Sequence, residues 1–362
     1  MTITATPPAV QTPRSMRITN GHLPSWSPWA ILGISFVISA AVFGVIAVGG
    51  AGFNVVGMII VGALLYLVLI GVVSTVVEGR RKATDRVVTG LVTGAFALAM
   101  VPLVSVAITV VQNGVAGLTA EFFSSSMRNV VGEGGGALHA IMGTVIITLA
   151  AAVVSIPIGL LTAIYLVEYG RGRLARGITF LVDVMTGIPS IVAGLFIYAL
   201  FALLVGPGIR LGVMGALSLA VLMIPVVVRS SEEMLRLVPN ELREASFALG
   251  VPKWLTILKV VLPTSIAGIV TGVMLAIARV IGETAPLLIT AGFTASMNYN
   301  LFDGRMMTLP VFVYTQYMNQ GIPPEAYVNR AWAAALVLIL IVMALNLIAR
   351  LVAKFFAPAK GR

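Results

Sequence analysis

The amino-acid sequence alternates between long apolar runs and short polar segments. Between Arg17 and Glu78 there is no Asp, Glu, Lys or Arg, yet a helix needs only about 20 apolar residues to cross a bilayer. We therefore expect two membrane-spanning helices in this stretch, separated near the small residues 49–52. Apolar runs without alternation favour helices over strands, and helices satisfy their own backbone hydrogen bonds in lipid.

The same pattern continues along the chain and predicts eight spans in an all-α membrane protein. Pro102, Pro157, Pro189 and Pro225 fall inside spans, where the missing backbone N–H is expected to kink the helix. The predicted spans are residues 29–49, 53–77, 87–111, 141–166, 178–205, 211–228, 264–282 and 331–349.

Charged residues are scarce and unevenly distributed. The chain is 59% hydrophobic and 10% charged, whereas soluble domains average about 25% charged residues. The net charge of +10 would favour a nucleic-acid partner in a soluble protein, but 18 of the 23 Lys and Arg residues lie on one side of the predicted membrane. The positive-inside rule makes this side cytoplasmic, together with both termini. The positive charge therefore reflects topology, and we expect membrane lipid as a partner and no nucleic acid.

Few residues are of the types that bind metals or catalyse reactions. There is no Cys, and the chain has two His residues, His22 and His139. We therefore expect no disulfide, no metal site, no cofactor and no catalytic residue. The glycine cluster at 132–136 lacks the Gly-Lys-Ser/Thr ending of a P-loop. If ATP drives this protein, another subunit must bind it.

Charge and polarity divide the chain into five segments. The first pair of spans has no ionisable residue within the membrane, which favours a lipid-facing anchor over part of a transport pathway. We expect a disordered cytoplasmic tail at 1–27, an extra helix pair with a basic loop at 28–86, a span and external loop at 87–138, the main transmembrane domain at 139–352, and a basic cytoplasmic tail at 353–362.

A polar segment at 230–263 interrupts the apolar pattern. Asn240 is expected to cap a first helix, and Gly250 stands where the end of that helix needs a positive φ. Proline is tolerated in a first helical turn, so Pro252 would open a second short helix. Pro263 would end this helix where the next span begins.

The first of these two helices offers a surface for another protein. Leu242, Ala245 and Leu249 fall on one side at roughly helical spacing. Small residues on that side let a partner backbone approach closely, and Glu244 supplies a charge. A stiff elbow transmits a push better than a flexible loop, so we expect this segment to couple nucleotide-driven motion to the spans. The alternative interpretation is a solvated amphipathic loop.

Two charges lie near the end of the seventh predicted span. Arg279 and Glu283 are four residues apart, so on a continuous helix they would share a face and form a pair. Charges at membrane depth are costly and commonly face a cavity. Arg279 is thus a candidate attractor for an anion, with Glu283 as the partner that keeps binding weak. The alternative is an internal ion pair between helices.

The fifth predicted span contains a break signal, because Thr186, Pro189 and Ser190 follow Asp183 within a few residues. An opened helix would present the Thr186 and Ser190 hydroxyls to a substrate, since irregular backbone at membrane depth lines a cavity or packs within protein. Hydrogen bonding between helices is the alternative role for these hydroxyls. Asp183 would repel an anion, so we assign Asp183 and Pro189 structural roles.

The polar segment resembles the EAA loop of binding-protein-dependent ABC importer permeases. Their pattern is E-A-A, three residues, Gly, nine residues and then I-x-L-P. Residues 244–250 read EASFALG and residues 260–263 read VVLP, with every spacing kept. Ser246 replaces the second Ala, and Val260 replaces the Ile. From about residue 139 to 350, the chain resembles the membrane domain of type I ABC importers.

Three further motifs resemble the phosphate-specific branch of these importers. They are residues 187–196 (GIPSIVAGLF), 278–288 (ARVIGETAPLL) and 308–314 (TLPVFVY). The last two are closer to PstA permeases than to their PstC companions. Members of this family usually have about six spans, so the extra N-terminal pair is a departure.

The resemblance implies a permease subunit of an ATP-driven phosphate importer in the bacterial inner membrane. It implies a PstC-like second permease, a PstB-like ATPase dimer and an external phosphate-binding protein as partners. The coupling residues would be Glu244, Ala245, Ser246, Gly250 and Pro263. Physical reasoning alone leaves open another oxyanion, such as molybdate or sulfate, or an ion-coupled secondary transporter.

Overall fold

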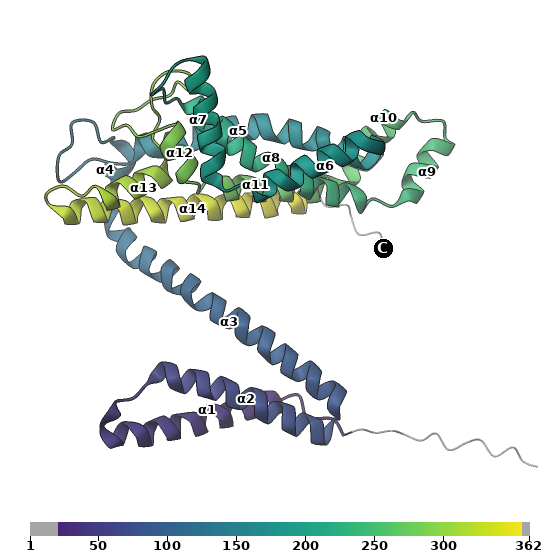
Figure 1. The fold of residues 1–362 in the computed structure, drawn as a ribbon, viewed down its shortest axis with the longest axis vertical. Coiled ribbons are helices and arrows are strands. Elements are labelled where there is room, and N and C mark those ends of the chain that lie inside the picture. The colour runs from purple at the N-terminus through teal and green to yellow at the C-terminus, as the bar shows by residue number, and fades with distance from the viewer. Residues whose placement is uncertain (1–20, 357–362) are drawn as a thin grey trace, which may run out of the picture. The chain divides into compact units, whose positions relative to one another are not determined.

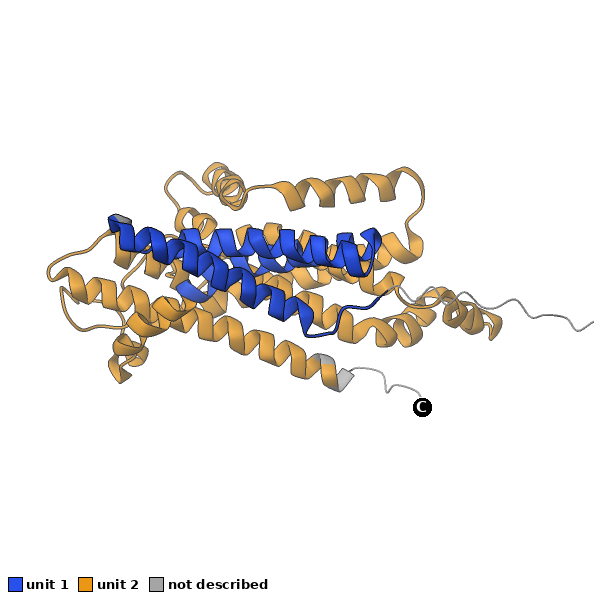
Figure 2. Ribbon diagram, turned by 90° about the horizontal axis from the view of Figure 1, so that it is seen from below, with its two compact units in different colours: residues 1–106 blue, residues 107–362 orange. Residues whose placement is uncertain are grey.

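The computed structural model describes residues 21–356, which form helices joined by turns and loops (Figure 1). No strand occurs in this range. The chain divides into two compact units, one ending at Val106 and the other beginning at Ala107 (Figure 2). This division falls inside a helix, whereas the segment boundaries expected from the sequence were at 86/87 and 138/139.

Unit 1 consists of a helical hairpin and most of a third helix. A short π-helical turn follows the first helix, and Gly50 and Gly52 then reverse the chain with φ values of +98° and +72°. Asn54 caps the second helix by accepting a 2.8 Å hydrogen bond from the Gly57 N–H. The elements are α1 (Ser27–Ile46), η1 (Ala47–Ala51), α2 (Val55–Val77) and α3 (Arg80–Gly114), which continues into unit 2.

Polar side chains join α1 to α2, although both helices are apolar on nearly every side. The Ser39 hydroxyl of α1 is buried and donates a 2.7 Å hydrogen bond to the Met58 carbonyl of α2. Only 11% of the most apolar window of each helix is buried within the structure. The remaining apolar surface is suited to lipid.

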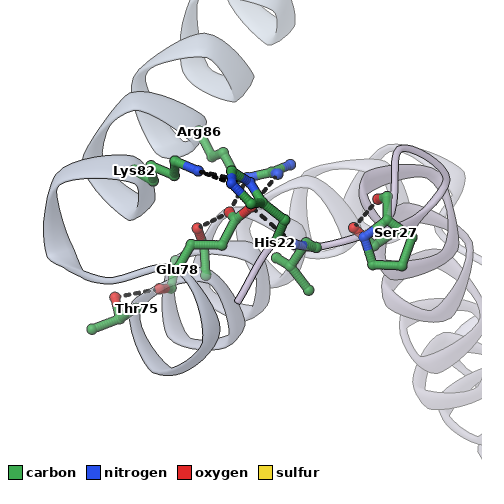
Figure 3. Close-up of polar contacts among 10 residues, drawn as sticks. His22, Ser27, Thr75, Glu78, Lys82 and Arg86 are labelled. Atoms are coloured by element: carbon green, nitrogen blue, oxygen red, sulfur yellow. Dashed lines mark hydrogen bonds and ion pairs between the residues drawn. The ribbon is translucent and has the colours of Figure 1, made fainter. Parts of the chain in front are cut away.

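The turn between α2 and α3 is built around a buried carboxylate. Glu78 forms a 2.6 Å ion pair with Arg86, and it also accepts hydrogen bonds from the Ser74 hydroxyl and the Leu23 N–H (Figure 3). The hydrogen bond from Arg86 is the main cause that lowers the pKa of Glu78 to about 2. Lys82 meets the ring of His22 at 2.8 Å.

These contacts correct two expectations. The basic loop at 78–86 is a turn of only two residues, because α3 begins at Arg80 and Gly79 has a φ of +91°. Residues 21–26 belong to a fixed contact with the α2–α3 turn and not to a disordered tail. The rest of the expected N-terminal tail, residues 1–20, lies outside the described residues.

Unit 2 is a bundle organised around two long helices, α5 and α8, which pack along each other. In α8, 61% of the most apolar window is buried, against 39% in α5 and 17% in α14. The central position of α8 follows from this difference. The bundle elements are η2 (Val115–Gly117), α4 (Ala120–Ser124), α5 (Leu138–Ile164), η3 (Tyr165–Tyr169), α6 (Gly172–Gly187), α7 (Ser190–Leu204), α8 (Gly212–Arg236), α9 (Asn240–Ala248), α10 (Lys253–Thr256), η4 (Ile257–Val261), α11 (Leu262–Val280), α12 (Ala285–Thr290), α13 (Leu309–Met318) and α14 (Pro324–Phe356).

The described residues contain seven helices of membrane-spanning length and composition, and the pair α6–α7 is a bent eighth candidate. The sequence predicted a single span at 178–205, but α6 and α7 meet at an angle of 108°. Pro189 has no N–H to continue the helix, and it holds Ile188 in an extended conformation with ψ of 127°. In contrast, α3, α5 and α8 continue through their internal prolines.

The last span is longer than the sequence predicted. α14 begins at Pro324 and ends at Phe356, whereas the apolar run predicted residues 331–349. Residues 353–356, expected to belong to the C-terminal tail, are therefore helical. The remaining tail residues, 357–362, lie outside the described part of the chain.

Candidate coupling elbow and substrate pathway

The polar segment at 237–256 projects from one end of unit 2. Figure 1 shows α9 and α10 at this end and α4, α12 and α13 at the other. Between these ends runs α8, whose 25 residues give a length of about 37 Å. This exceeds the roughly 30 Å thickness of a hydrocarbon core, so the two ends lie at opposite surfaces of a bilayer.

The end of α9 is a tight, hydrogen-bonded turn. Gly250 has a φ of +77°, as the sequence predicted. Its N–H bonds to the Phe247 carbonyl at 2.9 Å, and the N–H of Val251 bonds to the Ser246 carbonyl at 3.2 Å. This pair of bonds is a Schellman motif, which stops a helix at a residue that tolerates positive φ. We call α9, this turn and α10 the coupling elbow.

The entry to the elbow differs from the prediction. Asn240 is the first helical residue of α9 and forms no capping bond, because Pro239 occupies the capping position. The Asn240 side-chain oxygen instead lies 3.3 Å from a guanidinium nitrogen of Arg243.

The exit from the elbow also differs. A separate second helix was expected to stop at Pro263, but the chain is helical without a break from Lys253 to Val280. The π-helical turn Ile257–Val261 comes directly before Pro263, which occupies the first turn of α11. A locally widened turn accommodates a residue that has no N–H to donate. The elbow is therefore directly continuous with a membrane span.

A buried ion pair, which the sequence did not predict, attaches α9 to the end of α5. The Arg243 guanidinium lies 2.9 Å from the Glu168 carboxylate in η3, and both side chains are largely buried. Arg243 also donates to the carbonyls of Val238 and Leu235, at 2.6 and 2.9 Å. Arg243 thereby closes the α8–α9 turn and links three elements. The sequence separation between the two partners leaves no local signal by which this pair is recognised.

Two more contacts stiffen the elbow. The buried Ser246 hydroxyl lies 2.8 Å from the Thr256 hydroxyl, which joins α9 to α10. Lys253 donates to the Glu168 carbonyl and stands 4.8 Å from the centre of the Tyr169 ring. The hydroxyl of Ser246 therefore makes a cross-elbow contact that an alanine side chain cannot make.

The outer surface of the elbow is free of such contacts. Glu244, Ala245 and Gly250 are exposed, and Leu249 is 83% exposed. The choice between a docking surface and a solvated loop therefore stays a prediction. The buried side of the elbow thus fixes its shape, and the exposed side is available to another protein.

Asp183 takes part in a chain of ion pairs at the junction of α6 and α8. It pairs with Arg229, which also lies 3.0 Å from Glu232, and Glu232 lies 2.6 Å from Arg236. The structure thus places Asp183 in an ion pair, and its structural role stays a prediction. A carboxylate already paired with an arginine repels a passing anion less.

The hydroxyl residues lie at the bend between α6 and α7. The Thr186 hydroxyl donates to the Val182 carbonyl of its own helix at 2.9 Å, and within residues 21–356 it makes no bond to another helix. Pro189 is the capping residue of α7, and Ser190 is its first helical residue. The role of both hydroxyls in binding substrate remains a prediction.

Arg279 and Glu283 do not share a helix face. α11 ends at Val280, and the Glu283 N–H bonds to the Val280 carbonyl at 3.1 Å in a turn. Within the described range the two side chains form no ion pair with each other or with another residue. The sequence argument assumed a continuous helix, which the turn at residues 281–284 excludes. The exposed Arg279 side chain is consequently available to a ligand or another subunit.

The helical bundle and its projecting elbow define a class of protein, namely membrane proteins with several spanning helices and a rigid helical elbow at one end of the bundle. A chain of a solved bacterial ABC transporter for the acidic polysaccharide alginate has the same fold, with a TM-score of 0.52 and 11% sequence identity. The match covers 75% of this chain and 96% of that chain.

Sequence comparison narrows this class to a family. Residues 155–362 match the family of binding-protein-dependent transport system inner membrane components. The "Phosphate transport system permease protein PstA 1" of Mycobacterium tuberculosis is 46% identical over 78% of this chain and 91% of its own length. PstA of Pasteurella multocida is 41% identical over 70% of this chain and 87% of its own length. The chain belongs to the PstA family of ABC importer permeases.

Proposed function

We propose that this chain is the PstA-type permease subunit of an ATP-driven importer of inorganic phosphate. The observation that carries the proposal is the 46% identity to a phosphate transport system permease over 91% of that relative's length. The coupling elbow supports it independently, because a permease without a coupling surface could not use the energy of ATP.

The elbow would receive the motion of a PstB-like ATPase dimer on the cytoplasmic side. Glu244, Ala245 and Leu249 would contact the ATPase, while the buried contacts of Arg243 and Ser246 keep the elbow rigid. Pro263 would lie in the part of the helix that carries this motion into the membrane. The chain supplies no ATP site of its own in this scheme, and hydrolysis takes place on the partner subunits.

The continuous helix from Lys253 to Val280 would carry the motion to the substrate pathway. Its 28 residues extend about 42 Å, from the elbow to Arg279 in the last turn of α11, and Glu283 lies in the turn that follows. A push on the elbow therefore moves Arg279 without a flexible joint between them. This arrangement supports alternating access, in which the exposed face of α11 opens first to the outside and then to the cytoplasm.

The pathway itself would use one strong charge and weak polar groups. Arg279 attracts the anion, Glu283 limits the strength of binding, and the hydroxyls of Thr186 and Ser190 supply hydrogen bonds. α7, which begins at Ser190, packs against α12, which begins two residues after Glu283. The bend between α6 and α7 and the turn at residues 281–284 are thus parts of one packed region.

The remaining partners complete the pathway on both sides. A PstC-like permease would form the second half of the channel, and a phosphate-binding protein would deliver substrate from outside. In this topology both termini and the elbow are cytoplasmic in the bacterial inner membrane. The basic residues near the elbow then obey the positive-inside rule.

Uptake of labelled phosphate by cells that lack this gene tests the proposal. Cells complemented with the wild-type gene should accumulate phosphate, and those with Arg279→Ala should lose uptake by roughly tenfold or more, since removing a charged hydrogen-bond partner costs about 1.5–3 kcal/mol. Arg128→Ala removes an exposed arginine outside the proposed pathway and serves as the control. Accumulation of molybdate or sulfate in place of phosphate would refute the proposal.

A further inference from the structure

Two arginines converge on one glycine at the end of unit 2 opposite the coupling elbow. Gly292 follows α12, is buried and has a φ of +72°. A Cβ atom on Gly292 would stand 2.9 Å from Cδ of Arg210 and 3.4 Å from Cδ of Arg305. The two side chains come from different loops, yet they pack against the same point of the backbone.

Backbone hydrogen bonds fix the positions of both arginines. The residue after Arg210 donates its N–H to the Thr290 carbonyl at 3.1 Å. The residue after Arg305 donates its N–H to the Ala291 carbonyl, also at 3.1 Å. Each arginine is therefore held next to the C-terminal end of α12, and neither reaches Gly292 by a chance rotation of its side chain.

Both guanidinium groups lack a carboxylate partner among residues 21–356. Arg305 stacks 5.7 Å from the centre of the Phe293 ring, and neither arginine makes a side-chain hydrogen bond or an ion pair. Asp303, only two residues from Arg305, also forms no ion pair in this range. The side-chain stems of both arginines pass Gly292, and a bound anion would offset the repulsion between two like charges that come from the same place.

Arg330, near the start of α14, contrasts with these two arginines because most of its guanidinium group is bonded within the protein. Arg330 is 6% exposed, and it donates to the carbonyls of Gly132 and Gly134 and to the side chain of Gln316. Its hydrogen bonds join a loop to a helix. Arg210 and Arg305 make no such bonds, although their backbones are equally fixed.

We propose that Arg210 and Arg305 form an oxyanion-binding station that receives inorganic phosphate before it reaches Arg279. The inference rests on the proposed function, whose topology places this end outside the cell. Guanidinium groups bind phosphate oxygens through paired N–H donors, so two of them match an anion that carries between one and two charges. α12, only six residues long and about 9 Å in extent, and the turn at 281–284 separate Gly292 from Arg279 at the end of α11. An anion would thus meet the station first and Arg279 second on its way through the protein.

The test uses the complete transporter in vesicles of zwitterionic lipid, with phosphate-loaded binding protein in excess. Arg210→Gln and Arg305→Gln should each lower the initial rate of phosphate uptake roughly three- to tenfold, because partly exposed charges are screened. The double variant should lose less than the product of the two single effects, since both residues bind one anion. Arg128→Gln removes a charge on the same side, away from Gly292, and should leave the rate unchanged.

A binding measurement separates the sources of the anion. Equilibrium dialysis of inorganic phosphate against the solubilised complex without binding protein should show weaker binding for both variants, in the presence or absence of anionic lipid. If only anionic lipid binding changes, the station holds a lipid headgroup and the inference is wrong. If only affinity for the binding protein falls, the arginines dock that protein and the inference is equally wrong.

The two proposals fail in different ways. Normal uptake in both arginine variants, together with loss of uptake in Arg279→Ala, overturns the station and leaves the phosphate permease intact. A wild-type complex that does not accumulate phosphate overturns the proposed function. In that case, unchanged phosphate binding in the variants would overturn the station as well.

Discussion

At the scale of single residues, the structure separates charges that hold the fold from charges that are available to ligands. Glu168 and Arg243 are buried together, and Arg243 also donates hydrogen bonds to two backbone carbonyls. Arg279, in the last turn of α11, is exposed and forms no ion pair in the described range. A buried pair is costly to break because the remaining charge stays out of water, whereas an exposed charge is free to bind an anion.

The Arg243 contacts lead to a prediction about coupling. Arg243→Ala should destabilise the elbow by about 3 kcal/mol, because the change leaves the buried Glu168 carboxylate without its partner. Glu168→Gln should cost less, since Arg243 keeps its two carbonyl acceptors. In reconstituted vesicles, complete transporters that contain either variant should still hydrolyse ATP. The amount of phosphate taken up per ATP hydrolysed should be lower than in the wild type.

The control for this prediction is Arg236→Ala. Arg236 also pairs with a glutamate, but its side chain is 66% exposed, and such pairs contribute about 0–1 kcal/mol. Uptake per ATP should therefore stay near the wild-type value. Equal losses in Arg236→Ala and Arg243→Ala would show that the buried pair has no special role in coupling.

At the scale of elements, sequence patterns located the helices well and their junctions poorly. The apolar runs predicted the spans, and the spacing around Gly250 predicted the turn with positive φ. The α6–α7 bend, the short turn at Gly79 and the continuous helix through Pro263 differ from the predictions. Each of these junctions depends on which partners form hydrogen bonds with a few backbone N–H and C=O groups in the folded chain. The hydropathy pattern contains no information about these partners.

The candidate site shows the same limit. Motif spacing identified the elbow and its exposed residues, because that pattern is local. The contacts that stiffen it, between Glu168 and Arg243 and between Ser246 and Thr256, join segments that only the fold brings together. The expected pairing of Arg279 with Glu283 was wrong because it assumed that residues four apart share a helix face. α11 ends at Val280, before Glu283.

The α2–α3 turn leads to a prediction about pH. Arg86 lowers the pKa of Glu78 from 4.5 to about 2, so the folded turn favours the ionised carboxylate. Its contribution to the stability of unit 1 is complete above pH 4.5 and is lost as the pH falls toward 2. Glu78→Gln should therefore unfold at a lower temperature than the wild type at neutral pH.

The measurement follows Trp26 and Trp29 in unit 1 by fluorescence, in a chain whose Trp254 and Trp332 are replaced by Phe. The difference in Tm between the wild type and Glu78→Gln should shrink as the pH is lowered from 4.5 toward 2. A difference that stays constant over this range would mean that the ionised form of Glu78 does not stabilise the turn.

At the scale of the whole molecule, a permease core is joined to an additional membrane unit. The family match begins at residue 155 and lies within unit 2. α1 and α2 carry no charge in their apolar windows and fit an anchor in lipid. The elbow and the two arginines Arg210 and Arg305 both belong to unit 2.

Capture of a neighbour by the elbow tests the central claim most directly. The chain contains no Cys, so Leu249→Cys introduces a single reactive thiol on the exposed side of the elbow. A thiol crosslinker applied to the assembled transporter in cells should join this position to a nucleotide-hydrolysing subunit. The matched variant Val205→Cys, exposed beyond the end of α7, should capture no such subunit. Capture of no ATPase at Leu249→Cys, in cells where phosphate uptake is normal, would contradict the account.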